Sequence, residues 1–324
     1  MSDIADTAAT LTGYDPEAMD VGKVAAFLDT LLQGRPAPTP ETLSLRDSLG
    51  RVLAEKHGVP LVMDASWFNA EGWSQVNCLK LLPGPAAGTV KVVRRSSLAA
   101  RALLKATGKH YWEYRGVPVL RENERDQTFD PRFTQAPADC MLFGYFQSPL
   151  YFEGMEQTLR KELSTQGLGL EKGHEALAEK LAQPGSVAVH VRRTDYAGNP
   201  NLDLCGMNYY RTAMQRLRDS VPDARFLIFS DDPVWCRGNF RESDCEVVDS
   251  GGPSTPLTDL HLMSSASHHI IANSSYSWWA AWLGKKTGQR VLMPSVWFSG
   301  IHAPIEEKRI TGWETVDPTT SVLS

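Results

Sequence analysis

Residues 186–196 read SVAVHVRRTDY, and this stretch decides the fold class. The apolar run SVAVHV predicts a short buried strand, and a polar turn follows it directly. Four later stretches repeat the pattern of an apolar run that leads into polar residues: RFLIFS at 225–230, CEVV at 245–248, HHIIANSS at 268–275 and RVLMPS at 290–295. Helical patterns separate these strands, at 208–221, 255–266 and 275–286. Strands that alternate with helices predict an α/β fold with a parallel sheet covered by helices on both faces.

The first half of the chain is less regular. Pro40 suits the first position of a helix that Thr39 would cap and Gly58 would end, and VPLVM at 59–63 predicts a short strand. Further elements are expected as helices at 21–33, 96–106, 150–165 and 171–183 and as strands at 90–94 and 117–120. We therefore divide the chain into an N-terminal extension at 1–38, a first domain at 39–184 and a second domain at 185–324.

Composition excludes several classes of protein. The 324 residues are 42% hydrophobic and 22% charged, as in an ordinary globular protein. A net charge of -5 argues against a broad nucleic-acid-binding surface. The chain shows no signal-peptide pattern and no apolar run of membrane-spanning length, and its five cysteines are scattered. We expect a cytoplasmic protein with reduced thiols, and leave open peripheral association with the inner membrane.

Three polar clusters follow predicted strands, at 190–196, 230–232 and 273–275. Ligands of parallel sheets bind at the carboxyl ends of the strands, so these clusters are candidate site residues. In the first cluster, the planar fork of Arg192 or Arg193 suits a diphosphate, with Asp195 to orient it; a structural ion pair is the alternative. Ser274 and Ser275 lead into a helix N-terminus, which can bind an anion or simply be capped.

The remaining polar residues give weaker signals. Asp231 could bind ribose hydroxyls, a base edge or a metal, whereas Asp232 before Pro233 suits a helix cap. No D-x-D triplet stands at a strand end and the histidines match no ligand spacing, so we expect no metal. The Lys and Glu residues at 161–180 and 306–309 are interpreted as solvated helix faces. Trp278, Trp279 and Trp282 are interpreted as core packing.

The longer motifs resemble a known family. HVRRTDY resembles the H-x-R-R-x-D motif that α-1,2-, α-1,6- and protein O-fucosyltransferases share. YYRTAMQRLRDSVPDARFLIFSDDPVW at 209–235 and DLHLMSSASHHIIANSSYSWWAAWL at 259–283 resemble the α-1,2-fucosyltransferases of glycosyltransferase family 11, as do FDPRF at 129–133 and GYFQSPLYF at 144–152. The likeness runs from about residue 39 to residue 315.

This resemblance implies a fold, a donor and a set of site residues. The fold would be GT-B-like, with two Rossmann-like domains and a cleft between them. The reaction would move L-fucose from GDP-fucose, with inversion and without a metal or other cofactor, to the 2-hydroxyl of a terminal β-galactoside. The domain at 185–324 would bind the donor and the domain at 39–184 the acceptor. The resemblance further assigns roles to single residues: His190 and Asp259, at adjacent strand ends, would contact guanine, Arg192 the β-phosphate and Ser275 the diphosphate. From their positions at a helix N-terminus and a strand end, Ser274 and Asp231 are further candidate donor contacts.

Two departures from the family keep alternatives open. The expected G-G-L-G-N-Q-like turn is absent, and GRPAPTPETLSLRDSLG stands at 34–50 in its place. Pro200 occupies the position of a proposed base Glu of the α-1,6 enzymes, which leaves Asp195 as a weak candidate base. The alternatives are a fucosyltransferase of another linkage or acceptor, or a non-catalytic nucleotide-sugar or glycan-binding protein. A galactose-containing glycan, such as a bacterial surface glycan built in the cytosol, needs an aromatic face. Trp67, Trp73, Trp112, Tyr114 or Tyr145 could supply it, although for each of them core packing is the favoured alternative.

Overall fold

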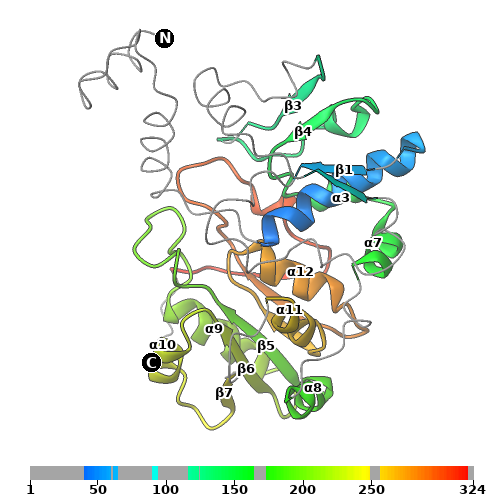
Figure 1. Cartoon of the computed structure of the whole chain (residues 1–324). Coiled ribbons are helices and arrows are strands. Elements are labelled where there is room, and N and C mark those ends of the chain that lie inside the picture. Colours follow the sequence, from blue (N-terminus) through cyan, green and yellow to red (C-terminus); the bar gives the residue numbers. More distant parts are fainter. Residues whose placement is uncertain are drawn as a thin grey trace, which may run out of the picture.

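The computed structural model describes residues 40–59, 61–64, 90–93, 116–123, 125–163, 173–248 and 256–319. Figure 1 shows that the second half, the described residues from 173 on, forms one layered unit, with the elements of the first half, the described residues up to 163, above it. The predicted extension at 1–38 and the predicted helices at 21–33 and 96–106 lie outside the described residues. The candidate acceptor aromatics Trp67, Trp73, Trp112 and Tyr114 lie outside them as well.

The second half is built on a parallel sheet of six strands. The strands are β5 (Ser186–Val191), β6 (Arg225–Ser230), β7 (Cys245–Val247), β8 (His268–Ile270), β9 (Val291–Pro294) and β10 (Glu314–Val316). Their order across the sheet is β7-β6-β5-β8-β9-β10, and every adjacent pair is parallel. Counted from β5 as the first strand, this is the Rossmann order 3-2-1-4-5-6, whose direction reverses between β5 and β8. The predicted α/β class is confirmed.

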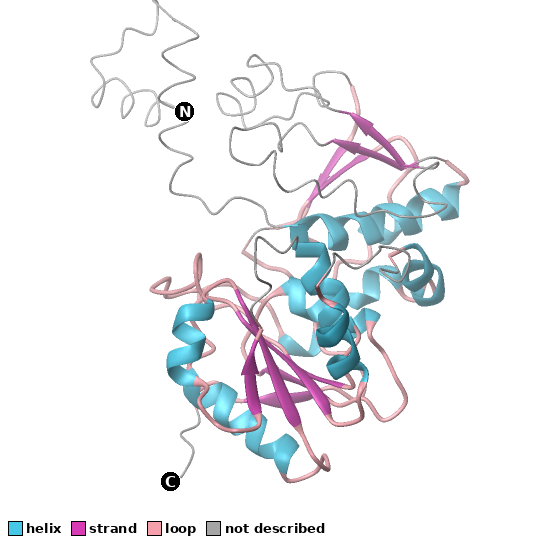
Figure 2. Ribbon diagram, turned by 60° about the horizontal axis from the view of Figure 1, so that its bottom comes forward, coloured by secondary structure: helices cyan, strands magenta, loops and turns pink. Residues whose placement is uncertain are grey.

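Helices cover both faces of this sheet (Figure 2). They are α8 (Glu175–Ala182), α9 (Met207–Arg218), α10 (Pro233–Asn239), α11 (Pro256–Ser264) and α12 (Ser275–Leu283). All six residues of β5 are buried, and alternate side chains enter different cores. Val187 and Val189 pack in the core that contains α9, whereas Ala188 packs in the core that contains α11. A strand covered on both faces explains why SVAVHV reads as a continuous apolar run.

The first half contributes helices, turns and two pairs of parallel strands. Its elements are α3 (Pro40–His57), β1 (Leu61–Asp64), β2 (Val90–Val93), β3 (Val119–Arg121), η3 (Phe133–Gln135), β4 (Met141–Phe143), η4 (Pro149–Phe152) and α7 (Glu156–Glu162). Strand β1 pairs with β2, and β3 pairs with β4. Helix α3 begins at Pro40 and ends before Gly58, as predicted, and Gly58 adopts a φ of 63° that favours glycine. The helix expected at 150–165 is instead a 3-10 turn followed by α7, because Gly154 between them has a φ of 84°.

An apolar cluster joins the two halves. Phe152 of η4 packs against the tryptophans of α12, with ring centroids 5.7 Å from Trp279 and 5.4 Å from Trp282. Both tryptophans are almost fully buried, so the packing role predicted for them is confirmed. Helix α3 also contacts α12. Helix α12 therefore lies where the first half meets the sheet of the second half.

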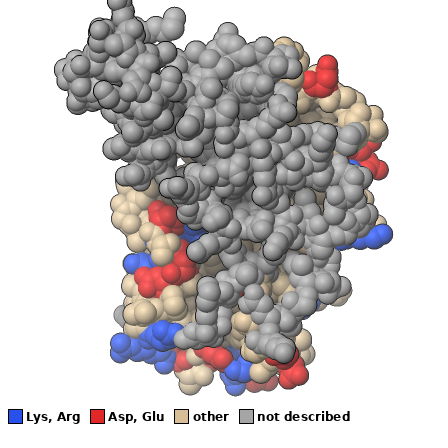
Figure 3. Space-filling view, in the orientation of Figure 1, with Lys and Arg blue, Asp and Glu red and all other residues tan. Residues whose placement is uncertain are grey.

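Predictions from the sequence also concern the surface charges, the apolar character of the helices and the charged segment at 161–180. On the coloured part of the face in Figure 3, Lys and Arg side chains lie beside Asp and Glu side chains along the edges. Among the described helices, none combines the length and the apolar character that crossing a bilayer requires. The segment at 161–180 is not uniformly solvated as expected, because Glu162 is buried and accepts hydrogen bonds of 2.8–3.1 Å from Arg51.

Candidate active site

Arg192 stands at the start of the turn that follows β5, and two carboxylates hold it. Its Nε and Nη2 atoms donate to the two oxygens of Asp195 at 2.7 and 3.0 Å. Nε also lies 3.3 Å from Oδ2 of Asp231. These contacts fix the direction of the guanidinium. The side chain of Arg192 is 18% exposed, so a ligand can still reach it. This geometry makes Asp195 an orienting partner of the arginine fork.

Asp231, at the end of β6, fixes the shape of the same turn. Its carboxylate accepts from the main-chain N–H of Arg193 at 2.8 Å, and from the main-chain N–H and the hydroxyl of Thr194 at 3.2 and 2.6 Å. Asp232 caps α10 as predicted, because it accepts from the N–H of Trp235 at 3.0 Å. Arg193 lies 3.4 Å from Asp232 and 4.0 Å above the Trp235 ring. The two arginines thus point in different directions, and each has a carboxylate partner.

His190, the next-to-last residue of β5, is a buried neutral imidazole. It is 5% exposed, and its ring centroid lies 5.4 Å from that of Tyr276. Burial, reinforced by the charge of Arg192, lowers the pKa of His190 to about 3. Within the described residues, its buried Nδ1 has no hydrogen-bond partner. A buried polar atom left without a partner is costly, and such atoms are typical of binding sites that a ligand completes.

The turn after β8 lies next to the turn after β5. The Tyr196 hydroxyl donates to the Asn273 carbonyl at 3.2 Å, which ties the two turns together. The Asn273 amide donates to the carbonyls of Leu202 and Trp297 at 3.0 and 3.1 Å. Ser274 then occupies the N-cap position of α12 without a capping hydrogen bond, and its buried Oγ has no hydrogen-bond partner among the described residues. The N-terminus of α12 therefore stands at the switch point of the sheet, near the turn that carries Arg192 and near His190.

Asp259 does not stand at a strand end, as the guanine-site hypothesis assumed. It lies in the first turn of α11 and is half-buried. Helix α11 packs against β5, which brings this helix to the face of the sheet that carries His190. The strand before it, β7, ends at Val247, so the acidic residue is separated from the strand end by several residues.

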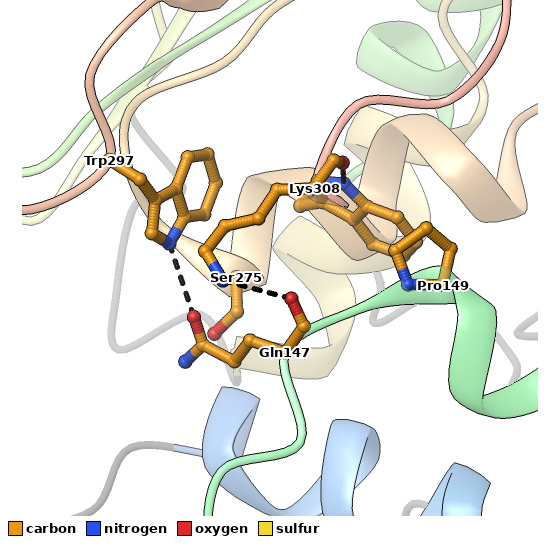
Figure 4. Close-up of a pocket in the computed structure, with 6 residues that line it drawn as sticks. Gln147, Pro149, Ser275, Trp297 and Lys308 are labelled. Atoms are coloured by element: carbon orange, nitrogen blue, oxygen red, sulfur yellow. Dashed lines mark hydrogen bonds between the residues drawn. The ribbon is translucent and has the colours of Figure 1, made fainter. Parts of the chain in front are cut away.

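A small pocket opens where the two halves meet (Figure 4). Its lining comes from Gln147 and Pro149 of the first half and from Ser275, Trp278, Trp297 and Lys308 of the second. The Trp297 indole N–H donates to Oε1 of Gln147 at 3.1 Å, and the Lys308 ammonium donates to the Gln147 carbonyl at 3.0 Å. Ser275 is the first residue of α12, so this pocket adjoins the helix N-terminus described above.

Lys308 was interpreted as part of a solvated helix face, and that interpretation is wrong. The side chain is 2% exposed. The preceding 3-10 turn, η5 (Ile305–Glu307), is three residues long, so the charges at 306–309 share no helical face. Neither hydropathy nor spacing distinguishes Lys308 from its charged neighbours, which is why sequence reasoning missed it.

The loop that carries Gln147 is tightly constrained. The buried carboxylate of Glu122 accepts from the main-chain N–H groups of Tyr145 and Phe146 at 2.5 and 3.0 Å. Phe146 adopts a φ of 50°, which is strained for an aromatic residue. Strained backbone of this kind is concentrated at functional sites. Tyr145, the one candidate acceptor aromatic among the described residues, is 37% exposed on this loop.

Residues 119–316 match the family model described as Glycosyl transferase family 11. The chain belongs to glycosyl transferase family 11. The matched range contains the β5 turn, the α12 N-terminus and the pocket at Gln147. The family predicted from the sequence motifs is therefore confirmed.

Three relatives illustrate what this family 11 chain is similar to. An alpha-1,2-colitosyltransferase of Escherichia coli is 32% identical over 166 residues, which cover 48% of this chain and 56% of that protein. The O-antigen biosynthesis glycosyltransferase WbnK of Escherichia coli is 34% identical over 120 residues, 36% of this chain and 40% of that protein. Galactoside alpha-(1,2)-fucosyltransferase 1 of Homo sapiens is 27% identical over 154 residues, 44% of this chain and 42% of that protein. The chain thus spans about half the length of these relatives.

Among solved structures, Escherichia coli heptosyltransferase WaaC with ADP-2-deoxy-2-fluoro heptose matches 86% of this chain and 90% of its own, at 10% identity and a TM-score of 0.40. Similarity at this level supports no statement about the site. In this family 11 chain, the residues gathered at the switch point are His190, Arg192, Asp195, Asp231, Ser274 and Ser275.

Proposed function

We propose that this chain is an inverting fucosyltransferase that moves L-fucose from GDP-fucose to the 2-hydroxyl of a terminal β-galactoside. One observation carries the proposal: Arg192, the unsatisfied His190 and the N-terminus of α12 meet at the switch point of a Rossmann-order sheet. Nucleotides bind at such switch points. Membership of family 11 and relatives named for α-1,2-fucosyl transfer support the choice of reaction.

In the proposed complex, the diphosphate binds between Arg192 and α12. Asp195 holds the guanidinium so that its fork faces the phosphate oxygens. As the bond between fucose and GDP breaks, negative charge grows on the β-phosphate. Arg192 and the N–H groups of the α12 N-terminus stabilise this charge more in the transition state than in the ground state. Since a cation and a helix terminus take this role, the proposed mechanism requires no metal ion.

The guanine base of GDP would bind on the His190 side of the site. His190 is neutral and keeps an unused Nδ1, so it can exchange a hydrogen bond with a base edge without titrating near neutral pH. Calorimetry should show GDP binding more tightly than UDP or ADP. Equal affinity for the three nucleotides would remove the guanine assignment.

The acceptor would enter from the first half, on the side of the Gln147 loop. Exposed Tyr145 offers an aromatic face beside polar groups, as a galactose site needs. Attack of the 2-hydroxyl on the face of fucose opposite GDP gives inversion, with the hydroxyl proton passing to a base.

The test is incubation with GDP-fucose and lactose or N-acetyllactosamine, followed by linkage analysis of the product. An α-1,2-fucosylated product supports the proposal, and the Arg192→Ala variant should lose at least 100-fold in rate, roughly the effect of removing a key electrostatic donor. Donor hydrolysis without transfer would keep the donor site and overturn the acceptor. The colitosyltransferase relative favours one second candidate, transfer of colitose, which a parallel incubation with the colitose donor would identify.

A further inference from the structure

Lys308 is a buried cation that no carboxylate neutralises directly. Its ammonium donates to the Gln147 carbonyl at 3.0 Å, and within the described part of the chain it forms no ion pair. An ammonium carries three N–H donors, so two remain for other partners. Burying a charge without an ion-pair partner destabilises the folded protein, so a buried ammonium suggests a role in binding.

The charges of two carboxylates, Glu122 and Glu307, act on Lys308 without forming an ion pair with it. Glu122 accepts from two main-chain N–H groups of the Gln147 loop, and Glu307 accepts from the N–H of Phe129. Their charges favour the ammonium, but burial is the larger effect and lowers the pKa of Lys308 to about 8. Lys308 is therefore still mainly protonated at pH 7, and its positive charge has no ion-pair partner among the described residues.

The pocket that Lys308 lines also contains the start of α12. Figure 4 shows the Lys308 side chain reaching toward Ser275 and the Gln147 backbone. The first turn of a helix presents unpaired N–H groups and the positive end of the dipole. The neighbouring Ser274 hydroxyl is 1% exposed and has no hydrogen-bond partner among the described residues. A buried cation, a free buried hydroxyl and a helix N-terminus together are complementary to an anion.

We propose that Lys308 is a second cation of the donor site, binding the diphosphate of the nucleotide sugar together with the N-terminus of α12. This inference rests on the proposed function, and adds to Arg192 a residue from the far end of the chain. Because Gln147 uses one N–H of the ammonium, the phosphate can take the other two without breaking that bond. The Gln147 loop, the second cation and the donor then form one connected unit.

The variant that tests the inference is Lys308→Met, which keeps the length of the side chain and removes its charge. GDP affinity, measured by calorimetry at pH 7, should fall roughly 10- to 100-fold, the range expected for a hydrogen bond to a charged group. Guanosine, which lacks the phosphates, should bind the variant as it binds the wild type, which also reports that the site is folded. Lys286→Met is the matched control, since Lys286 donates to the Ser265 carbonyl outside the pocket.

A measurement on the unmodified protein covers the case in which the variant does not fold. If a phosphate binds Lys308, its pKa rises, so at pH 8 GDP binding should take up about half a proton. The phosphate itself, with a second pKa of about 6, contributes little there. Absence of proton uptake, or equal GDP affinity of wild type and Lys308→Met, would overturn the inference while leaving the proposed function intact. A wild type that binds no GDP would instead refute the proposed function.

Discussion

The burial of His190 predicts a specific loss of stability in acid. His190 and His269 are both buried, with pKa values lowered to about 3 and about 4, chiefly by burial. In the unfolded chain both imidazoles titrate near 6.5. Between about pH 6.5 and these folded-state values, the unfolded state binds more protons than the folded state. The free energy of unfolding therefore falls as the pH is lowered from 6.5.

The size of the effect follows from linkage. At pH 5, protonation of one such histidine in the unfolded state alone lowers the free energy of unfolding by ~2 kcal/mol, against nearly nothing at pH 7. His190→Leu removes one of the two buried imidazoles. Its loss of stability between pH 7 and pH 5 should thus be ~2 kcal/mol smaller than that of the wild type. The carboxylates that also titrate in this range are common to both proteins and cancel in the comparison.

The assay is urea denaturation of both proteins at pH 7 and pH 5, followed by circular dichroism. His302→Gln, which removes an exposed histidine, is the control and should follow the wild type. If His190→Leu and wild type lose the same stability within about 0.5 kcal/mol, the imidazole is not held neutral and buried, and the reasoning fails. The same variant should lose preference for GDP over UDP, which would connect the unsatisfied Nδ1 to recognition.

Three further predictions concern the site and its support. Asp195→Asn should lower the transfer rate roughly 10- to 100-fold, because one charged acceptor of the Arg192 fork is lost; an unchanged initial rate would contradict the orienting role. Gly144→Ala should destabilise the protein by about 1–3 kcal/mol in thermal denaturation, because the added Cβ would lie 2.4 Å from Cβ of Glu122, whereas Gly238→Ala meets no atom within 4 Å and should not destabilise. Transfer should survive EDTA; loss of turnover that manganese or magnesium restores would show that the charge on the leaving diphosphate is not carried by protein groups alone.

The sheet of the second half could be predicted because its strands are buried on both faces. Ser186–Val191 and Arg225–Ser230 are continuous apolar runs, and such runs need no tertiary information to be recognised. Met141–Phe143 and Glu314–Val316 were not predicted as strands. Each becomes a strand by pairing with a parallel neighbour, which the local sequence does not reveal.

The candidate site was predictable where chemistry and local sequence coincide. Arg192 and Asp195 lie three residues apart in one turn, so their pairing follows from the motif. The buried ammonium of Lys308 does not, since its contact with Gln147 joins residues 161 positions apart. Asp259 lies within the helix that the sequence predicted at 255–266, so its assignment to a strand end disagreed with that prediction, and α11 corrects it.

The central claim is that GDP binds at the switch point between β5 and β8. A crystal structure of the protein with GDP tests it most directly. We expect the guanine near His190 and the diphosphate in contact with Arg192 and the N-terminus of α12. A nucleotide bound away from this edge of the sheet, or no binding at millimolar GDP, would contradict the account.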